Sequence, residues 1–437
     1  MIVRGVVTAS ASLGIPFLLS NVLARGTMNT WVLIVGLTSW IRMLDLGITG
    51  AVVRFVARES ALETQSQIVR AGSRILRLPA VLATVALGTL AVLFNRAYPT
   101  AARTAGARSA LLIMTLFAVL TLLLSPANGF FVAQHKGRFL AITLAASRTS
   151  QIIATLVTAV LTKNLFWIAG VFSFAEALGA AYTWWQFHRK CSNSTTKMKE
   201  SLRGELRRHS TSGAVWAVAS IAVASVDTAI VARVDPGATS EYALCLALTA
   251  TVGGLHAALL SPLIAQVASV TTGPQAASAL VMGAARRTNR IMAGATAMLL
   301  LFTPIVIVAA GSDIDRRRMA TVLAVLHLAN FLRFLAAPYS TALLGTGEHR
   351  KVMASPILEA STNLGASIVL GHYHGAVGVA VGTLIGATAS ILLHLFYNMP
   401  RTPLIAIKAR RYVSEAIAIN LSVVLLASGA TLVLANR

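Results

Sequence analysis

The chain has 437 residues, of which 56% are hydrophobic and only 12% charged, and its net charge is +23. A water-soluble protein of this length could not bury so large an apolar fraction in its core, so the composition indicates a polytopic membrane protein. The two cysteines, Cys191 and Cys245, are too few for a disulfide framework or a cysteine-based metal site. We therefore expect no metal and no cofactor.

Thirteen apolar segments are long enough to cross about 30 Å of hydrocarbon as helices. Their Leu, Ala and Val runs lack two-residue alternation, which favours an all-α bundle over a β-barrel. In chain order the segments are 6–24, 31–57, 78–95, 109–134, 139–162, 165–187, 213–233, 240–270, 290–310, 319–346, 352–371, 375–399 and 413–435. Because their ends are poorly defined, we expect roughly 12 to 14 transmembrane helices.

One long polar stretch, "HRKCSNSTTKMKESLRGELRRHS", begins at His188 and has the composition of a linker. It divides the chain into a six-helix lobe at 1–187, a basic linker at 188–212 and a second six-helix lobe at 213–399. A basic loop and an extra helix follow at 400–437. The halves are weakly similar, with "VLAR" at 22–25 resembling "IVAR" at 230–233. Two such lobes predict a central cavity lined by cations.

The basic residues are distributed unevenly over the loops. With the N-terminus in the cytoplasm, the cytoplasmic loops hold most of the Lys and Arg, including those of the 188–212 linker. The basic surplus then reflects topology and attraction to anionic lipid headgroups, and nucleic-acid binding is not expected. We expect a multi-pass protein of the cytoplasmic (inner) membrane.

Glycines mark two special places in the predicted helices. In "GITG", Gly47 and Gly50 weaken the second helix. In "GVAVGTLIG", Gly378, Gly382 and Gly386 form a ladder of small residues that lets a neighbouring helix approach closely.

Four arginines lie inside predicted spans: Arg42, Arg54, Arg148 and Arg333. An arginine at mid-bilayer costs on the order of 3 kcal/mol by insertion scales, so these side chains should face water or a partner. Guanidinium groups stay charged at physiological pH and match phosphate oxygens with paired donors. We therefore predict that the four arginines bind an anionic, phosphate-bearing substrate.

Four intramembrane acids are candidates for coupling to an ion: Asp45, Asp227, Glu176 and Glu359. The alternative is that the acids form structural ion pairs, with Asp45 neutralising Arg42 and with Glu176 or Glu359 pairing Arg148 or Arg333. Three intramembrane histidines are interpreted as packing residues without chemistry: His256, His327 and His394. The coupling ion, H⁺ or Na⁺, stays open.

The sequence contains no Walker loop, HExxH, GxSxG or CxxC motif. We therefore expect a transporter rather than an enzyme. It would use an ion gradient, the membrane potential or mass action.

Three stretches resemble a known family: "MLDLGITGAVVRFVARES", "VDTAIVARVDPGATSEYALCLAL" and "LLGTGEHRKVMASPILEASTNLGASIVLGHYHGAVGVAVGTLIG". They are similar to segments of lipid-linked oligosaccharide flippases. This is the polysaccharide-biosynthesis branch of the multidrug/oligosaccharidyl-lipid/polysaccharide (MOP) exporter superfamily. The likeness extends over nearly the whole chain. "RGTMNTWVL" departs from the family's usual pattern after the first helix, and an odd number of helices departs from the common twelve or fourteen.

The resemblance implies alternating access by two lobes of a MATE-like fold. The cargo would be an undecaprenyl-pyrophosphate-linked glycan for a surface polysaccharide or exopolysaccharide, with membrane lipids and polysaccharide polymerase or assembly proteins as partners. Two alternatives stay open. One is an ion-coupled multidrug exporter of the same superfamily, and the other is a non-transporting membrane component of a glycan-assembly complex.

Overall fold

The computed structural model describes residues 15–16, 18–45, 47–134, 136–191, 204, 206, 226–268, 273–309, 315–346 and 348–435. Within these ranges the regular secondary structure is entirely helical, as the sequence predicted. The chain forms two compact units, which are mainly Val22–Gly237 and Ala238–Arg437. Each unit is described separately below.

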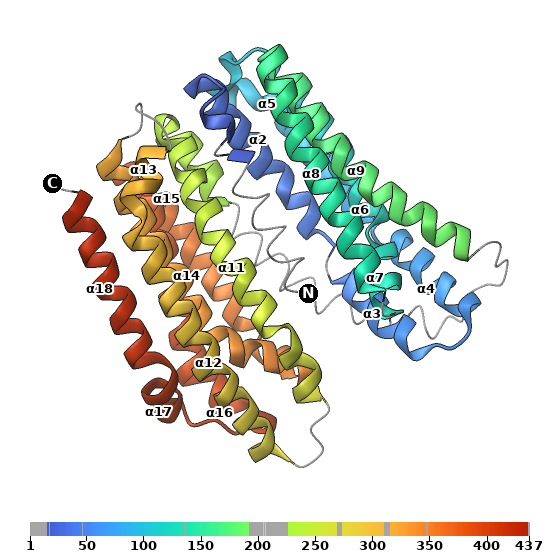
Figure 1. Ribbon diagram of the computed structural model, residues 1–437, viewed down its shortest axis with the longest axis vertical. Helices are drawn as coiled ribbons and strands as arrows, with labels where there is room; N and C mark the ends of the chain where they lie inside the picture. Colours follow the sequence, from blue (N-terminus) through green and yellow to red (C-terminus); the bar gives the residue numbers. More distant parts are fainter. Residues whose placement is uncertain are drawn as a thin grey trace. The chain divides into compact units, whose positions relative to one another are not determined.

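The first unit contains α2 (Arg25–Met43), α3 (Ile48–Arg58), α4 (Leu62–Ile75), α5 (Arg77–Ala97), α6 (Ala107–Leu124), α7 (Pro126–Ala133), α8 (Gly137–Thr162) and α9 (Leu165–Lys190). Helix α9 packs along both α6 and α8 (Figure 1). Residues 226–234 are also helical, and the turn after them joins this unit because Arg25 Nη2 donates to the Gly237 carbonyl at 3.0 Å. Asn29 Nδ2 donates to the Pro236 carbonyl at 2.8 Å. Most of the predicted 188–212 linker lies outside the described residues.

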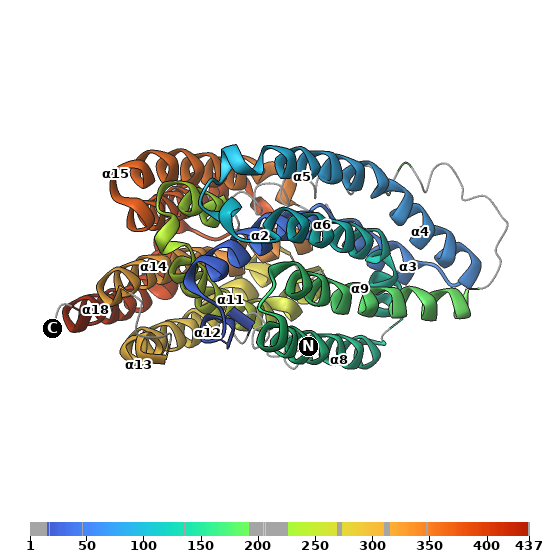
Figure 2. The same cartoon turned by 90° about the horizontal axis from the view of Figure 1, so that it is seen from above.

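The second unit contains α11 (Thr239–Ala268), α12 (Pro274–Leu301), α13 (Thr303–Ala309), α14 (Arg316–Thr346), α15 (Ala354–Leu393), α16 (Met399–Arg401), α17 (Ala409–Tyr412) and α18 (Ala418–Ala435). Helix α14 is central to this unit because it contacts α11, α12, α15 and α18. Figure 2 shows these helices from above, with α14 between α12 and α15. Short π-helical turns at His394–Asn398 and Val413–Ile417 connect the later helices.

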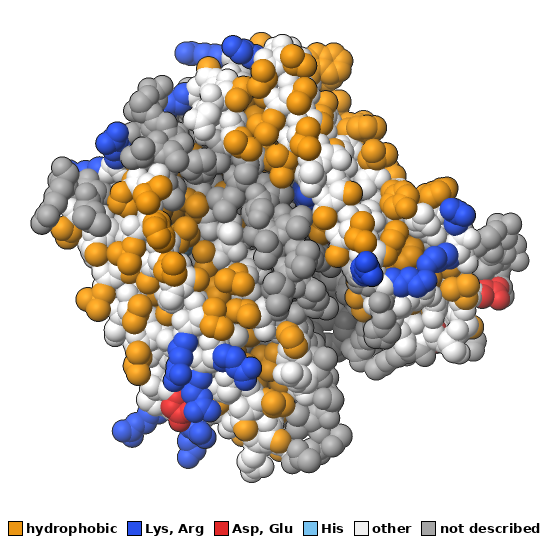
Figure 3. Space-filling view, viewed as in Figure 1, with side chains coloured by type: hydrophobic (Ala, Val, Ile, Leu, Met, Phe, Trp, Pro, Cys, Tyr) orange, Lys and Arg blue, Asp and Glu red, His pale blue; other side chains and the backbone are white. Residues whose placement is uncertain are grey.

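By length and composition, seven helices among the described residues can cross a membrane: Leu62–Ala97, Ala107–Ala133, Arg138–Thr162, Leu165–Lys190, Arg316–Leu343, Ala354–Arg401 and Ala409–Val433. The helix Ala354–Arg401 has 48 residues and contains two of the predicted segments, 352–371 and 375–399, almost completely. The predicted segments 6–24 and 213–233 lie mostly outside the described residues. Exposed hydrophobic side chains cover the flanks of each unit, and Lys and Arg gather mainly toward helix ends (Figure 3). This distribution suits a multi-pass membrane protein.

Helix α15 is a hairpin of two antiparallel segments. Gly375, with φ 56° and ψ −139°, interrupts the helix in a conformation that L-residues with side chains rarely adopt. The predicted glycine ladder then packs on the preceding segment: Gly378 meets Leu370, Gly382 meets Ser367 and Gly386 meets Asn363. Ser367 Oγ donates to the Val379 carbonyl at 3.2 Å across this contact. The predicted close approach of a neighbouring helix is confirmed, and that neighbour is the other arm of the hairpin.

A buried ion pair joins the starts of α11 and α14. Arg318 Nη2 lies 2.8 Å from Glu241 Oε2, and the Glu241 side chain is only 3% exposed. The backbone N–H of Asp315 donates to Glu241 Oε1 at 3.4 Å. Because a buried carboxylate needs a charged partner, this contact fixes the register of the two helices.

We expect Arg318→Gln to destabilise the second unit by roughly 3 kcal/mol, because it removes the cation that contacts the buried Glu241 carboxylate. The midpoint of thermal unfolding in detergent should fall, and the double variant Arg318→Gln/Glu241→Gln should recover much of the loss. Arg317→Gln is the matched control because Arg317 is exposed on the same turn. Equal midpoints for the Arg318 and Arg317 variants would contradict a stabilising pair.

Candidate functional site

Arg148 lies near the middle of α8 and reaches toward α9. Its Nη2 lies 3.2 Å from Glu176 Oε1, and its Nη1 donates to Gln151 Oε1 at 2.6 Å. Gln151 is held in turn because its Nε2 donates to the Phe172 carbonyl at 2.8 Å. Glu176 and Gln151 therefore both hold the Arg148 guanidinium within the first unit.

Arg333 occupies a comparable position near the middle of α14. Its Nε donates to Glu359 Oε1 at 2.6 Å, and its Nη1 donates to Asn330 Oδ1 at 3.1 Å. Its Nη2 is buried and has no hydrogen-bond partner among the described residues. One corner of this guanidinium is therefore left without a protein acceptor in the part of the chain that the structure describes.

Both arginines thus form the ion pairs that the sequence left open as an alternative. The side chains of Arg148 and Glu176 are 18% and 16% exposed, and those of Arg333 and Glu359 are 22% and 13% exposed. These fractions show that neither pair is sealed within its unit. Pairing lowers the cost of holding a guanidinium in a bilayer, and partial exposure leaves each group accessible.

The other two predicted arginines cannot be placed in the site. Arg42 lies in α2 and Arg54 in α3, but both side chains fall outside the described residues. Their predicted role in substrate binding, and the predicted pairing of Arg42 with Asp45, stay predictions.

Asp45 lies at the break between α2 and α3. Gly47 has φ 72°, so the helix is interrupted at the predicted weak point. Asp45 Oδ1 accepts from Thr49 Oγ1 at 2.8 Å and from Ser125 Oγ at 3.1 Å, and Oδ2 accepts from the Thr49 N–H at 3.2 Å. The carboxylate therefore caps the start of α3 and ties it to the junction of α6 and α7. The sequence did not reveal this capping role.

Asp227 is buried, at 1% exposure, in the helical stretch 226–234 of the first unit. Its neighbour Thr228 packs against α2, close to the backbone of Gly36. The predicted role of Asp227 in ion coupling stays a prediction.

The structure adds a polar cluster that the sequence interpretation missed. His394 Nδ1 lies 2.9 Å from Asn398 Nδ2, and that amide also contacts Ser355 Oγ. Thr402 Oγ1 donates to the Asn398 carbonyl at 3.1 Å and lies 2.6 Å from the Tyr339 hydroxyl. His394, Asn398 and Thr402 recur every four residues, and this polar period within an apolar stretch was the signal that could have revealed the cluster.

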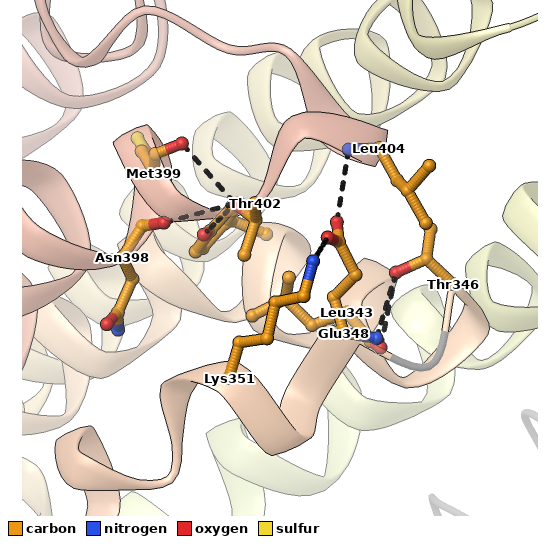
Figure 4. Close-up of polar contacts among 9 residues, drawn as sticks. Leu343, Thr346, Glu348, Lys351, Asn398, Met399, Thr402 and Leu404 are labelled. Carbon is orange, nitrogen blue, oxygen red and sulfur yellow. Dashed lines mark hydrogen bonds and ion pairs between the residues drawn. The ribbon is translucent and has the colours of Figure 1, made fainter.

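In the same region of the second unit, Glu348 joins two turns (Figure 4). Glu348, whose side chain is 3% exposed, lies 2.7 Å from Lys351 Nζ and accepts from the Leu404 N–H at 3.2 Å. The turn after α14 is thereby joined to the turn after α16.

Among the described residues, no group of three or more His, Cys, Asp or Glu side chains is placed to hold a metal ion. Cys191 and Cys245 are both buried thiols. Burial raises the pKa of the Cys191 thiol, and the nearby Arg70 and Lys190 oppose that shift only in part. This environment favours an inert thiol over a reactive one.

Sequence comparison identifies no relative: no family model matches the chain, and neither does any curated protein sequence. Comparison of structures is informative. The lipid II flippase MurJ in an inward closed conformation matches with a TM-score of 0.71 and 14% identity, covering 100% of this chain and 98% of MurJ.

Multidrug transporters match nearly as well. An inward-facing multidrug resistance MATE transporter of the MOP superfamily has a TM-score of 0.66 and 14% identity, covering 92% of this chain and 95% of the other. A eukaryotic MATE transporter has a TM-score of 0.58, also at 14% identity, covering 95% and 98%. At sequence identities this low, the similarity shows a shared fold and nothing more specific. The predicted fold is therefore confirmed: this chain has the helical fold that MurJ and the MATE transporters of the MOP exporter superfamily share.

Proposed function

We propose that this protein is a MOP-type transporter. It flips an anionic, undecaprenyl-pyrophosphate-type lipid-linked oligosaccharide across the cytoplasmic membrane by alternating access, with its N-terminus in the cytoplasm. Its role is in cell-surface polysaccharide biosynthesis. The observation that carries this proposal is that each unit holds a partly exposed, mid-helix guanidinium, on a fold that matches a lipid flippase over the whole chain.

The chemistry of the guanidinium group supports an anionic cargo. Arg148 and Arg333 are charged at every physiological pH and offer planar donors suited to phosphate oxygens. Each is neutralised by one glutamate in the present arrangement, so a pyrophosphate would have to compete with that carboxylate. Arg333 Nη2 is buried and has no acceptor among the described residues, so the guanidinium must shift before this donor can reach a headgroup. A headgroup with two negative charges is better placed to compete than a singly charged one.

The fold also admits a multidrug exporter, since MATE transporters match with TM-scores up to 0.66. An organic cation would be repelled by unpaired guanidinium groups and attracted by unpaired carboxylates. The Arg148–Glu176 and Arg333–Glu359 pairs are neutral as units, so in this arrangement they favour neither a cation nor an anion. The lipid flippase MurJ, however, matches the fold with the higher TM-score of 0.71. We therefore place the lipid-linked anion first. The coupling ion, H⁺ or Na⁺, and contacts with polymerase or assembly proteins belong to the same proposal.

Headgroup selectivity in reconstituted vesicles tests this proposal. The purified protein is placed in proteoliposomes with a fluorescent prenyl-pyrophosphate disaccharide, and flipping is followed by quenching from the outside. We expect faster flipping of this lipid than of a neutral prenyl glycoside of the same length, and no uptake of a lipophilic cation dye. Cation uptake with no flipping would favour the multidrug exporter, and the absence of both would contradict a transport function.

A further inference from the structure

One exposed face of α9 changes in character toward the end of the helix. The residues on this face recur every three or four positions and so lie on one side: Phe174, Leu178, Tyr182, Trp185 and Arg189. Phe174 and Leu178 are apolar and are 52% and 57% exposed. Tyr182 and Trp185, at 43% and 50%, each add a polar atom to an aromatic ring, and the exposed Arg189 follows them. The face therefore matches the order of a bilayer, from acyl chains through the interface to the headgroups.

A row of aromatic rings runs from this face of α9 to α8 and α7. The ring centroids of Trp185 and Tyr182 lie 5.8 Å apart, and those of Tyr182 and Phe139 on α8 lie 6.1 Å apart. The Phe139 centroid in turn lies 4.8 Å from that of Phe131 on α7. Gln186 Nε2 donates to the Tyr182 hydroxyl at 3.0 Å, which helps to hold the middle of the row. Rings from three helices thus form one continuous row.

A cation lies over each end of this row. Arg189 Cζ is 5.0 Å from the centre of the Trp185 ring. Lys190 Nζ is 5.1 Å from the centre of the Phe131 ring, and both distances are within the range of a cation–π contact. A third cation, Lys136, is adjacent to the Phe131 end because its backbone N–H donates to the Phe131 carbonyl at 2.9 Å. All three cations are exposed, and Figure 3 shows basic side chains beside hydrophobic ones where α9 ends.

The end of α9 does not need all of this positive charge. The helix dipole places only about half a negative charge at a C-terminus. Arg70 Nη2 already donates to the Cys191 carbonyl at this end, at 3.3 Å. Among the described residues, none of the three exposed cations forms an ion pair with an acid. Most of the charge of Lys136, Arg189 and Lys190 is therefore available to an anionic partner.

We propose that this surface binds one anionic phospholipid of the surrounding bilayer. We call it the α7–α9 patch and define it by its three cations and three of its rings: Lys136, Arg189, Lys190, Phe131, Tyr182 and Trp185. The lipid phosphate accepts hydrogen bonds from the cations, and the glycerol region lies against the exposed rings. An acyl chain follows Leu178 and Phe174 along α9.

The apolar continuation of the patch favours a lipid over a soluble anion. Free phosphate would use the cations alone, whereas a diacyl phospholipid also covers the exposed Leu178 and Phe174 with hydrocarbon. The basic surplus of the whole chain predicts only a diffuse attraction to headgroups, but the patch predicts one site with a defined stoichiometry. This binding is separate from cargo transport, because the patch includes neither Arg148 nor Arg333.

Native mass spectrometry of the full-length protein in detergent tests the proposal, with dioleoylphosphatidylglycerol and dioleoylphosphatidylcholine as probes. We expect one phosphatidylglycerol to bind each wild-type molecule in clear preference to phosphatidylcholine. Lys136→Gln/Lys190→Gln should weaken phosphatidylglycerol binding by about fivefold for each lysine removed. Arg96→Gln/Arg103→Gln is the matched control, because both arginines are exposed on the first unit by the turn between α5 and α6. This control removes the same charge and should bind phosphatidylglycerol as the wild type does.

Tryptophan fluorescence provides a second measurement that leaves the charges in place. Phosphatidylglycerol with brominated acyl chains should quench the wild-type protein more than brominated phosphatidylcholine does, and Trp185→Phe should lose most of that difference. Equal binding of the two lipids by the wild type would overturn the proposal. So would an equal loss of binding in the two double variants, which would indicate net charge instead of a site, or an unchanged quenching difference in Trp185→Phe.

Discussion

Replacing Arg148 or Arg333 by glutamine is expected to abolish export of the lipid-linked glycan while the protein remains in the membrane at its normal level. Each substitution removes a guanidinium that stands near the middle of a helix and pairs with one glutamate. Losing a bidentate phosphate contact should weaken headgroup binding by about tenfold to a hundredfold, on the order of 1.5–3 kcal/mol for a charged hydrogen bond. Surface polysaccharide and membrane protein level are both measured by immunoblotting.

The paired glutamates provide the control that separates binding from folding. Arg148→Gln alone removes the cation that contacts the partly buried Glu176, and Arg333→Gln removes the cation that contacts Glu359, so either single variant could lose stability. The double variants Arg148→Gln/Glu176→Gln and Arg333→Gln/Glu359→Gln remove both charges together. If the arginines bind cargo, the double variants should be stable and still inactive. Recovery of export in both double variants would show that the pairs serve structure alone.

Exposed arginines supply a further comparison. Arg138 lies on α8 with Arg148, and Arg287 lies on α12 of the second unit; both side chains are exposed. Arg138→Gln and Arg287→Gln remove the same amount of charge without touching the mid-helix positions. Both should export normally, and a loss as large as that of the Arg148 and Arg333 variants would point to net charge rather than to the site.

Gly382→Ala is expected to destabilise the α15 hairpin strongly. A Cβ at this position would lie within contact distance of the Ser367 backbone and 2.5 Å from Ser367 Oγ. Real Cβ atoms do not approach so closely, so the two arms of the α15 hairpin must separate. Overpacking of this kind costs roughly 1–3 kcal/mol when side chains can yield, and backbone atoms yield less readily. The yield of monodisperse protein and its thermal midpoint report the loss.

Gly365→Ala is the matched control because it lies on the first arm of the same hairpin with nothing within 4 Å of the new Cβ. Alanine also has the higher helix propensity, so this variant should be as stable as the wild type or slightly more stable. Equal stability of the two alanine variants would contradict the close packing at Gly382.

The class of fold was accessible from the sequence because hydropathy is a local, additive property. Any window of about 20 apolar residues predicts a membrane helix whatever its neighbours are. The glycine ladder at Gly378, Gly382 and Gly386 was equally readable, since its spacing places all three residues on one helix face. The sequence did not predict which helix would pack against this glycine face.

The partners of the intramembrane charges were only partly accessible. The sequence offered Glu176 and Glu359 as alternative ion-pair partners of Arg148 and Arg333, and it left open which acid contacts which arginine. Arg148 and Glu176 meet because α8 and α9 are antiparallel neighbours joined by a short turn. Arg333 and Glu359 meet through the packing of α14 on α15. Such pairings depend on helix rotation and register, which hydropathy does not encode.

Composition and residue spacing by themselves determined that this protein is a helical membrane protein with arginines and acids inside its predicted spans. Tertiary structure alone decided that Asp45 meets Ser125, that Arg333 keeps an unpartnered nitrogen among the described contacts, and that His394 and Asn398 join Ser355 in a polar cluster. The physical reason is that the burial of apolar surface is summed along the chain, so composition and spacing predict it. A hydrogen bond or an ion pair instead requires two atoms to lie within about 3 Å of each other, and the packing of distant helices sets that distance.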